Sequence, residues 1–159
     1  MANEFALNLQ DASLNPATWA LPTQVGESNG KKSAAVDLGA DTFKIALYTG
    51  TATLNETTGS YVALNEVANG NGYTTGGQTL TVTVAPTVSS GGTVAYLSFA
   101  NVTWNPASFT CRGALIYKYD GATNPSVCVL DFGADKTATN TFQVQFPAAT
   151  SSSAIIRIA

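Results

Sequence analysis

Apolar and polar residues alternate along most of the chain after its first fifth, and this period of two is typical of β-strands. Residues 79–85 are the clearest case, because Leu80, Val82 and Val84 alternate with threonines. Residues 42–49 follow the same pattern with larger apolar side chains. The pattern predicts strands at residues 42–49, 79–85, 93–99, 109–119, 126–132, 141–146 and 154–158, with 60–67 as a weaker candidate.

Turn sequences separate these predicted strands. They are rich in Gly, Asn, Asp and Pro, which favour tight turns for distinct steric reasons, and they are found at 69–72, 76–77, 89–92, 105–108 and 120–125. About eight strands with almost no helical periodicity predict an all-β fold. The natural arrangement is an antiparallel β-sandwich, jelly-roll-like, over residues 34–159.

Residues 1–33 have a different pattern, in which a few apolar side chains are spaced along a polar chain. Asn15 as a cap and Pro16 at the first helical position predict a short helix near residues 15–20. The segment is either an extended N-terminal arm that docks on a neighbouring subunit or a terminal strand and turn that close its own core. The anchors of such an arm are Phe5, Leu7, Leu9, Trp19 and Leu21.

Charged residues make up only 11% of the chain, against about 25% in ordinary globular domains. The absence of histidine excludes imidazole-based catalysis and most zinc sites. A net charge of −3 provides no basic surface for phosphates, so we expect no nucleic-acid partner. No apolar stretch is long enough to span a bilayer, and the N-terminus lacks a secretion signal. We therefore expect a chain that is made in the cytosol and has no membrane partner.

The two cysteines, Cys111 and Cys128, are expected to be free buried thiols. If 109–119 and 126–132 form a hairpin around the 120–125 turn, Cys111 lies well away from the residue that faces Cys128. A disulfide between them is the less favoured alternative.

One short motif occurs twice, as DLGAD at 37–41 and DFGAD at 131–135. A Ca²⁺ site needs six or more oxygen ligands, and neither segment offers more than two carboxylates, so we expect no metal and no cofactor. Asp and Gly are also the ordinary residues of corners between strands. A pair of carboxylates for glycoside cleavage is the one enzymatic arrangement available, and only if both corners meet in space. We do not expect an enzyme.

The aromatic side chains allow two interpretations. Trp104, Tyr117 and Tyr119 could form a platform on which a sugar stacks, but aromatic residues at alternating strand positions are more often core. Tyr61 and Tyr73 occur in segments rich in Asn and Gly, so we expect them to be exposed loop contacts.

Seven phrases follow one another along the chain after residue 42. They are FKIALYTG at 43–50, NEVANGNGYTTGGQTL at 65–80, VTW at 102–104, FTCRGALIYKYDG at 109–121, VLDFGADK at 129–136, FQVQFPA at 142–148 and IIRI at 155–158. In this fixed order they resemble a family of small virion proteins of tailed bacteriophages, which implies synthesis in the cytoplasm of a bacterial host. Together they span about three-quarters of the chain, and residues 1–33 lie outside the resemblance.

The resemblance implies a compact β-sandwich that assembles on the phage particle and has no catalytic motif. The leading expectation is a capsid decoration or cement protein in the virion, with the major capsid protein and copies of itself as partners, in a trimer or another symmetric oligomer. The alternative is a tail or head-fibre module whose loops at 69–77 and 120–125 face a receptor glycan.

Overall fold

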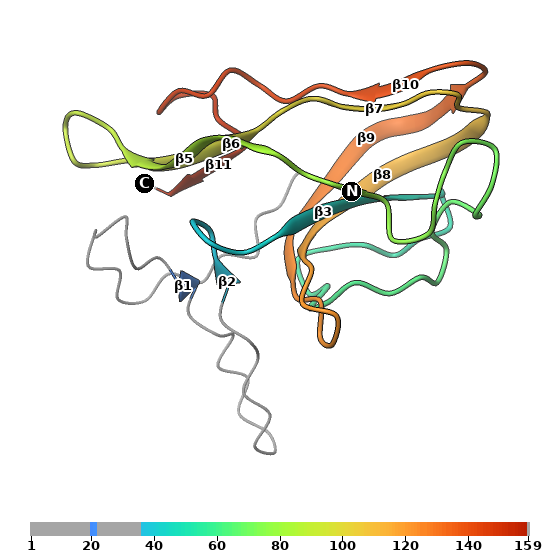
Figure 1. Cartoon of the computed structure of the whole chain (residues 1–159), viewed down its shortest axis with the longest axis horizontal. Helices are drawn as coiled ribbons and strands as arrows, with labels where there is room; N and C mark the ends of the chain where they lie inside the picture. The colour runs from blue at the N-terminus through green and yellow to red at the C-terminus, as the bar shows by residue number, and fades with distance from the viewer. Residues whose placement is uncertain (1–19, 22–35, 159) are drawn as a thin grey trace. The chain divides into compact units, whose positions relative to one another are not determined.

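The computed structural model describes residues 20–21 and 36–158. Every regular element in these ranges is a β-strand, and every strand pair is antiparallel (Figure 1). The predicted all-β class with antiparallel sheets is confirmed. Residues 1–19, 22–35 and 159 lie outside the described part, and with them the proposed anchors Phe5, Leu7, Leu9 and Trp19.

The largest sheet has four strands in the order β4-β3-β8-β9. They are β4 (Gln78–Thr79), β3 (Phe43–Tyr48), β8 (Phe109–Lys118) and β9 (Ser126–Ala138). The central pair β3–β8 and the long hairpin β8–β9 give the sheet most of its backbone hydrogen bonds. The hairpin was predicted from the turn at 120–125, and the structure confirms it.

Three smaller sheets complete the set of strands. A three-stranded sheet has the order β11 (Ile156–Ile158), β6 (Ala95–Phe99) and β5 (Val82–Val88). Two-stranded sheets pair β7 (Val102–Trp104) with β10 (Phe142–Val144), and β1 (Ala20–Leu21) with β2 (Val36–Asp37).

The described chain divides into two compact units. Unit 1 contains Thr42–Thr79 and Val102–Val144, and therefore the four-stranded sheet and the β7–β10 pair. Unit 2 contains Leu80–Asn101, the segment from Gln145 onward and, of the residues before β3, 20–21 and 36–41. The predicted strand 79–85 is split between the units, because Thr79 pairs with β3 whereas Val82 pairs with β6.

One sequence prediction needs correction. Residues 60–67 do not form a strand, and only Ser60 and Glu66 make isolated bridges. The helix predicted near 15–20 lies outside the described residues except for Ala20, which is in β1 opposite Asp37.

The second DxGAD motif lies within a strand, although the sequence predicted a corner there. Between the pairs Cys111–Lys136 and Gly113–Asp131, β8 advances two residues while β9 advances five. The extra residues of β9 form a wide bulge opposite Arg112. The Asp131 carboxylate accepts a hydrogen bond from the backbone N–H of Gly133 at 2.9 Å. The left-handed φ of +75° suits glycine at that position.

The first copy of the motif repeats the same local bond. The Asp37 carboxylate accepts a hydrogen bond from the N–H of Gly39 at 2.8 Å, two residues along the chain. The shared sequence therefore reflects a shared Asx-turn, in which an aspartate side chain satisfies a nearby backbone donor.

The two cysteines are buried free thiols, and the strand register separates them. Cys128 is opposite Ile116 and Cys111 is opposite Lys136. Burial raises the pKa of each thiol to about 12, and the charge of Asp135 contributes at Cys111. The off-register placement expected from the hairpin is confirmed.

Gly77 is the last residue of the segment between β3 and β4, and it lies close to the backbone of β3. A Cβ there would lie 1.8 Å from the carbonyl oxygen of Ile45, and φ is +66°. Gly121 has a similar φ of +73° but open space around its Cα.

We predict that Gly77→Ala destabilises the protein by about 3 kcal/mol or more, because a backbone clash adds to the cost of the left-handed conformation. Gly121→Ala, the matched control, should cost only about 1 kcal/mol. Urea unfolding of both variants measures the difference, and equal losses would contradict the close approach at Gly77.

Candidate interaction surface

The segment 49–77, between β3 and β4, crosses one face of the four-stranded sheet in unit 1 (Figure 1, teal to green). Its Ala52 and Leu54 belong to the same buried cluster as Tyr48, Leu115 and Tyr117 of the sheet. This cover explains why β3 is buried on both faces, although alternation predicted one buried face. A long segment without strands of its own is often functional.

A buried carboxylate holds this segment in place. Glu66 is only 9% exposed and accepts three hydrogen bonds. The donors are the hydroxyl of Tyr73 at 2.5 Å, the hydroxyl of Tyr61 at 2.6 Å and the backbone N–H of Gly76 at 2.7 Å. Burying a charge is costly unless it is hydrogen-bonded, and charge-assisted bonds are the strong ones. The three donors compensate the charge of Glu66 within the segment itself.

Tyrosines connect this carboxylate to the sheet. The Tyr73 hydroxyl also accepts a hydrogen bond from the backbone N–H of Leu47 at 2.9 Å. The Tyr117 hydroxyl donates to the carbonyl of Gly76 at 2.8 Å. The ring of Tyr61 stacks on that of Tyr117 at 4.6 Å between centroids. The residues around Glu66 are therefore joined to β3 by the bond between Tyr73 and Leu47. They are joined to β8 by the contacts of Tyr117.

Burial and the nearby charge of Glu66 raise the pKa of Tyr117 to about 12. Desolvation is also the largest cause of the raised pKa values of Tyr48, Tyr61 and Tyr73, and the negative charge of Glu66 adds to it in each case. All four phenols are held in their protonated form.

The structure corrects one expected loop contact. Tyr73 is 2% exposed and packs against the rings of Trp104 and Phe109, so it is a core residue. The glycine-rich sequence around it suggested exposure, but the buried bonds to Glu66 and Leu47 turn the side chain inward. Tyr61 is half-buried, with its hydroxyl on Glu66.

The other aromatic residues follow the favoured interpretation with one exception. Trp104 and Tyr117 are buried, as the core interpretation predicted. Tyr119 is 51% exposed, and the ammonium of Lys44 lies 5.0 Å from the centroid of its ring. A sugar platform built from all three aromatics does not exist.

The same segment exposes apolar side chains beside a pocket. Val62 is 50% exposed and Leu64 is 76% exposed. Both line a surface pocket of about 280 Å³ in which no lining residue is charged. The lining residues are Ala52, Thr53, Leu54, Thr58, Gly59, Ser60, Val62, Leu64 and Asn65. An uncharged, partly apolar pocket at an exposed position is a candidate site for protein contacts.

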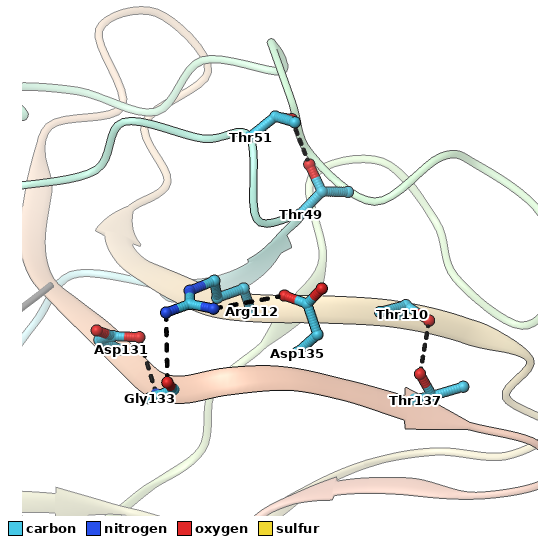
Figure 2. A network of polar contacts seen from close by, with 8 residues as sticks. All are labelled: Thr49, Thr51, Thr110, Arg112, Asp131, Gly133, Asp135 and Thr137. Carbon is cyan, nitrogen blue, oxygen red and sulfur yellow. Dashed lines mark hydrogen bonds and ion pairs between the residues drawn. The ribbon is translucent and has the colours of Figure 1, made fainter.

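A strip of polar side chains lies on the β8–β9 hairpin and the turn after β3 (Figure 2). Arg112 reaches across the bulge of β9, where it donates to the carbonyl of Gly133 at 3.3 Å and lies 3.8 Å from the Asp135 carboxylate. The hydroxyls of Thr110 and Thr137 are 2.8 Å apart.

The turn after β3 adds two more hydroxyls to this strip, because Thr49 and Thr51 are hydrogen-bonded at 2.9 Å. A Cβ on Gly50 between them would lie 3.1 Å from the Asp135 carboxylate, so the turn lies close to β9. Hydroxyls both donate and accept, and such a strip can join an interface without burying an unpaired charge.

No group of three or more His, Cys, Asp and Glu side chains in the described ranges is arranged to hold a metal ion. In the same part of the chain, no helix has the length and apolarity needed to cross a bilayer. No family model, curated protein or solved structure matches the chain.

Sequence reasoning missed the residues that shape this surface. Glu66 is a lone acidic residue with no motif around it, so nothing in the sequence marked it as a buried acceptor. Val62 and Leu64 alternate as in a strand, so the pattern suggested a buried face where the structure exposes both side chains.

We predict that Glu66→Gln lowers the free energy of unfolding by about 1–3 kcal/mol, because the amide replaces one accepting oxygen and removes the charge from three hydrogen bonds. Glu56→Gln, at an exposed position of the same segment, is the matched control and should change stability by less than about 0.5 kcal/mol. Urea unfolding measures both, and a Glu66 variant as stable as the control would show that the network does not hold the segment.

We also predict a steep loss of stability at alkaline pH. Above pH of about 10 the unfolded chain loses its tyrosine protons, whereas the folded chain keeps that of Tyr117 up to about pH 12. The unfolded state therefore binds fewer protons, and stability falls by up to about 1.4 kcal/mol per pH unit for each such tyrosine. The buried cysteines act in the same direction from about pH 9.

The measurement is urea unfolding at a series of pH values, with phenolate absorbance followed in parallel. Tyr117→Phe should make the fall with pH shallower than in the unsubstituted protein. Gradual ionisation of all the tyrosines in the folded protein would contradict the prediction.

Proposed function

We propose that this protein is a structural component of a tailed-phage virion, and that it acts as a capsid decoration or cement protein. In this proposal it is an antiparallel, jelly-roll-like β-sandwich that binds the outer shell as a trimer or another symmetric oligomer. Its partners are the major capsid protein and copies of itself. Its work is to stabilise the shell, with no catalytic step and no cofactor.

The observation that carries the proposal is where the family-like phrases fall in the fold. FKIALYTG forms β3, VTW forms β7, and FTCRGALIYKYDG contains β8. The phrase at 65–80 contains Glu66, Tyr73 and Gly76, which hold the segment against the sheet. Most of the resembling phrases therefore fall on residues that build and lock unit 1, and IIRI contains β11 of unit 2.

The character of the surface also supports an assembly role. Unit 1 presents a strip of threonine hydroxyls and a pocket with an uncharged, partly apolar lining. Such surfaces become buried in a lattice without stranding charges. A protein that binds only the closed shell stabilises it by mass action, and many identical sites add up through avidity.

In this proposal residues 1–33 are an arm that clips onto a neighbouring subunit. Phe5, Leu7, Leu9, Trp19 and Leu21 are its anchors. Burial of a large aromatic such as Trp19 contributes roughly 2–3 kcal/mol. Ordering the backbone costs about 1–2 kcal/mol per residue, so only a few well-seated anchors can hold an arm.

We predict that purified virions contain this protein in hundreds of copies, as quantified by stained gel. Deletion of residues 2–30 should leave the melting temperature of the isolated protein similar and sharply lower its occupancy on particles. Trp19→Ala should act in the same direction to a smaller extent. A copy number between three and a few dozen would instead favour the tail or head-fibre module, and absence from the virion would overturn both.

A further inference from the structure

We propose that Asn71 is a site of spontaneous covalent modification, at which the folded protein loses ammonia and gains a carboxylate, whereas the nearby Asn69 is protected. Both asparagines precede a glycine, as Asn69–Gly70 and Asn71–Gly72. A glycine in this place favours the reaction, because it has no side chain to hinder attack by its own backbone nitrogen. The inference is independent of the proposed function, since it rests only on the backbone bonds of this turn.

The reaction needs a free backbone nitrogen and a free side-chain amide. The nitrogen of Gly72 attacks Cγ of Asn71, and a new C–N bond closes a five-membered imide. The bond from Cγ to the side-chain nitrogen breaks, and that nitrogen leaves as ammonia with the proton that water has carried from the Gly72 N–H. A water molecule then opens the imide at either carbonyl. Opening at Cγ gives aspartate, and opening at the backbone carbonyl gives isoaspartate, in which the main chain runs through the former side chain.

Two hydrogen bonds close a two-residue turn around Asn71 and Gly72. The N–H of Gly70 donates to the carbonyl of Tyr73 at 2.8 Å, and the N–H of Tyr73 donates to the carbonyl of Gly70 at 2.9 Å. The central residues have φ values of +53° and +87°, as in the type I′ turn that favours Asn followed by Gly. A Cβ at Gly72 would lie 1.7 Å from the carbonyl oxygen of Pro106. The fold therefore requires a glycine after Asn71, and the reactive pair comes with it.

The bonds of the turn protect Asn69. The nitrogen that would attack its side chain is that of Gly70, whose N–H is held by the carbonyl of Tyr73. This bond must break before the nitrogen can react. The side-chain oxygen of Asn69 also accepts the N–H of Thr75 at 3.3 Å, which restrains the group under attack.

The same turn leaves the reacting groups of Asn71 free. Within the ranges that the structure describes, neither the N–H of Gly72 nor the side-chain amide of Asn71 has a hydrogen-bond partner, and both residues are exposed. The backbone carbonyl of Asn71 accepts the N–H of Ser108 at 2.9 Å. That carbonyl is retained in the imide, so the reaction does not have to break this bond.

Modification at this position acts on the segment that contains Glu66. The turn lies directly before Tyr73, whose hydroxyl bonds Glu66 and the backbone N–H of Leu47. Aspartate leaves the backbone as it was. Isoaspartate adds one carbon to the main chain inside the turn, so the two bonds between Gly70 and Tyr73 lose their present register. We therefore expect isoaspartate, and not aspartate, to loosen the attachment of Tyr73.

The test is to incubate the full-length protein at mildly alkaline pH, both folded and in concentrated urea, and to locate the product by mass spectrometry. Cleavage after Glu66 and Tyr73 releases residues 67–73, which contain both asparagines and exclude the third such pair, Asn29–Gly30. In the folded protein Asn71 should react roughly three- to tenfold faster than Asn69, because one more hydrogen bond must break at Asn69. In urea the two rates should agree within about twofold, since neither bond is formed.

Two variants check the assignment. Asn71→Gln should abolish the product of the folded protein, because the longer side chain would have to close a six-membered ring, and Asn69→Gln should leave that product unchanged. Equal rates at the two asparagines in the folded protein, faster reaction at Asn69, or no reaction at either while the urea-treated chain reacts would overturn the inference.

A stability measurement tests the consequence for Tyr73. The modified protein separates by ion exchange, because its net charge is one unit more negative than −3. Its isoaspartate fraction should unfold at a lower urea concentration than Asn71→Asp, which has the same charge on an ordinary backbone. Identical unfolding of the two would overturn the expected effect on the segment.

Discussion

The buried carboxylate of Glu66 is the interaction on which the described part of unit 1 depends. The carboxylate accepts three hydrogen bonds, two from tyrosine hydroxyls and one from a backbone N–H. All three donors belong to the segment 49–77 that contains Glu66. Because Tyr73 also bonds Leu47 and Tyr117 bonds Gly76, the segment cannot leave the sheet without exposing several satisfied polar groups at once. A buried network of this kind destabilises the fold when one of its groups lacks a partner. When every group is bonded, it favours one specific arrangement of the core.

The hydrogen bonds around Glu66 hold the segment in a conformation that leaves some of its apolar side chains exposed. Ala52 and Leu54 pack inward with the sheet. Val62 and Leu64 remain exposed because the backbone between Tyr61 and Glu66 is held by hydrogen bonds, including that from Tyr48 to Val62. Their exposure is therefore maintained by the fold and is a feature that a partner can use.

The sequence predicted the strands of unit 1 well, because the period of two survives in β3 and in the β8–β9 hairpin. It did not predict that β9 continues to Ala138, because DFGAD has the composition of a corner, and only the register with β8 shows the bulge opposite Arg112. It also placed Tyr73 at the surface, since local composition carries no information about a carboxylate seven residues away. Glycine-rich segments become buried when long-range polar bonds compensate their backbone, and those bonds are invisible to periodicity.

The threonine strip and the pocket of unit 1 share one property, which is that they carry few charged groups. Ordinary soluble domains rely on ionic groups to limit contact with other proteins, whereas this chain is only 11% charged. Its exposed strip instead pairs hydroxyl with hydroxyl at Thr49–Thr51 and Thr110–Thr137, and its single guanidinium there is already turned toward Gly133 and Asp135. Groups satisfied in this way lose little on desolvation, because their partners move with them into an interface. A surface of internally satisfied hydroxyls and a partly apolar pocket is compatible with the lattice role proposed above, where each contact is modest and the number of contacts is large.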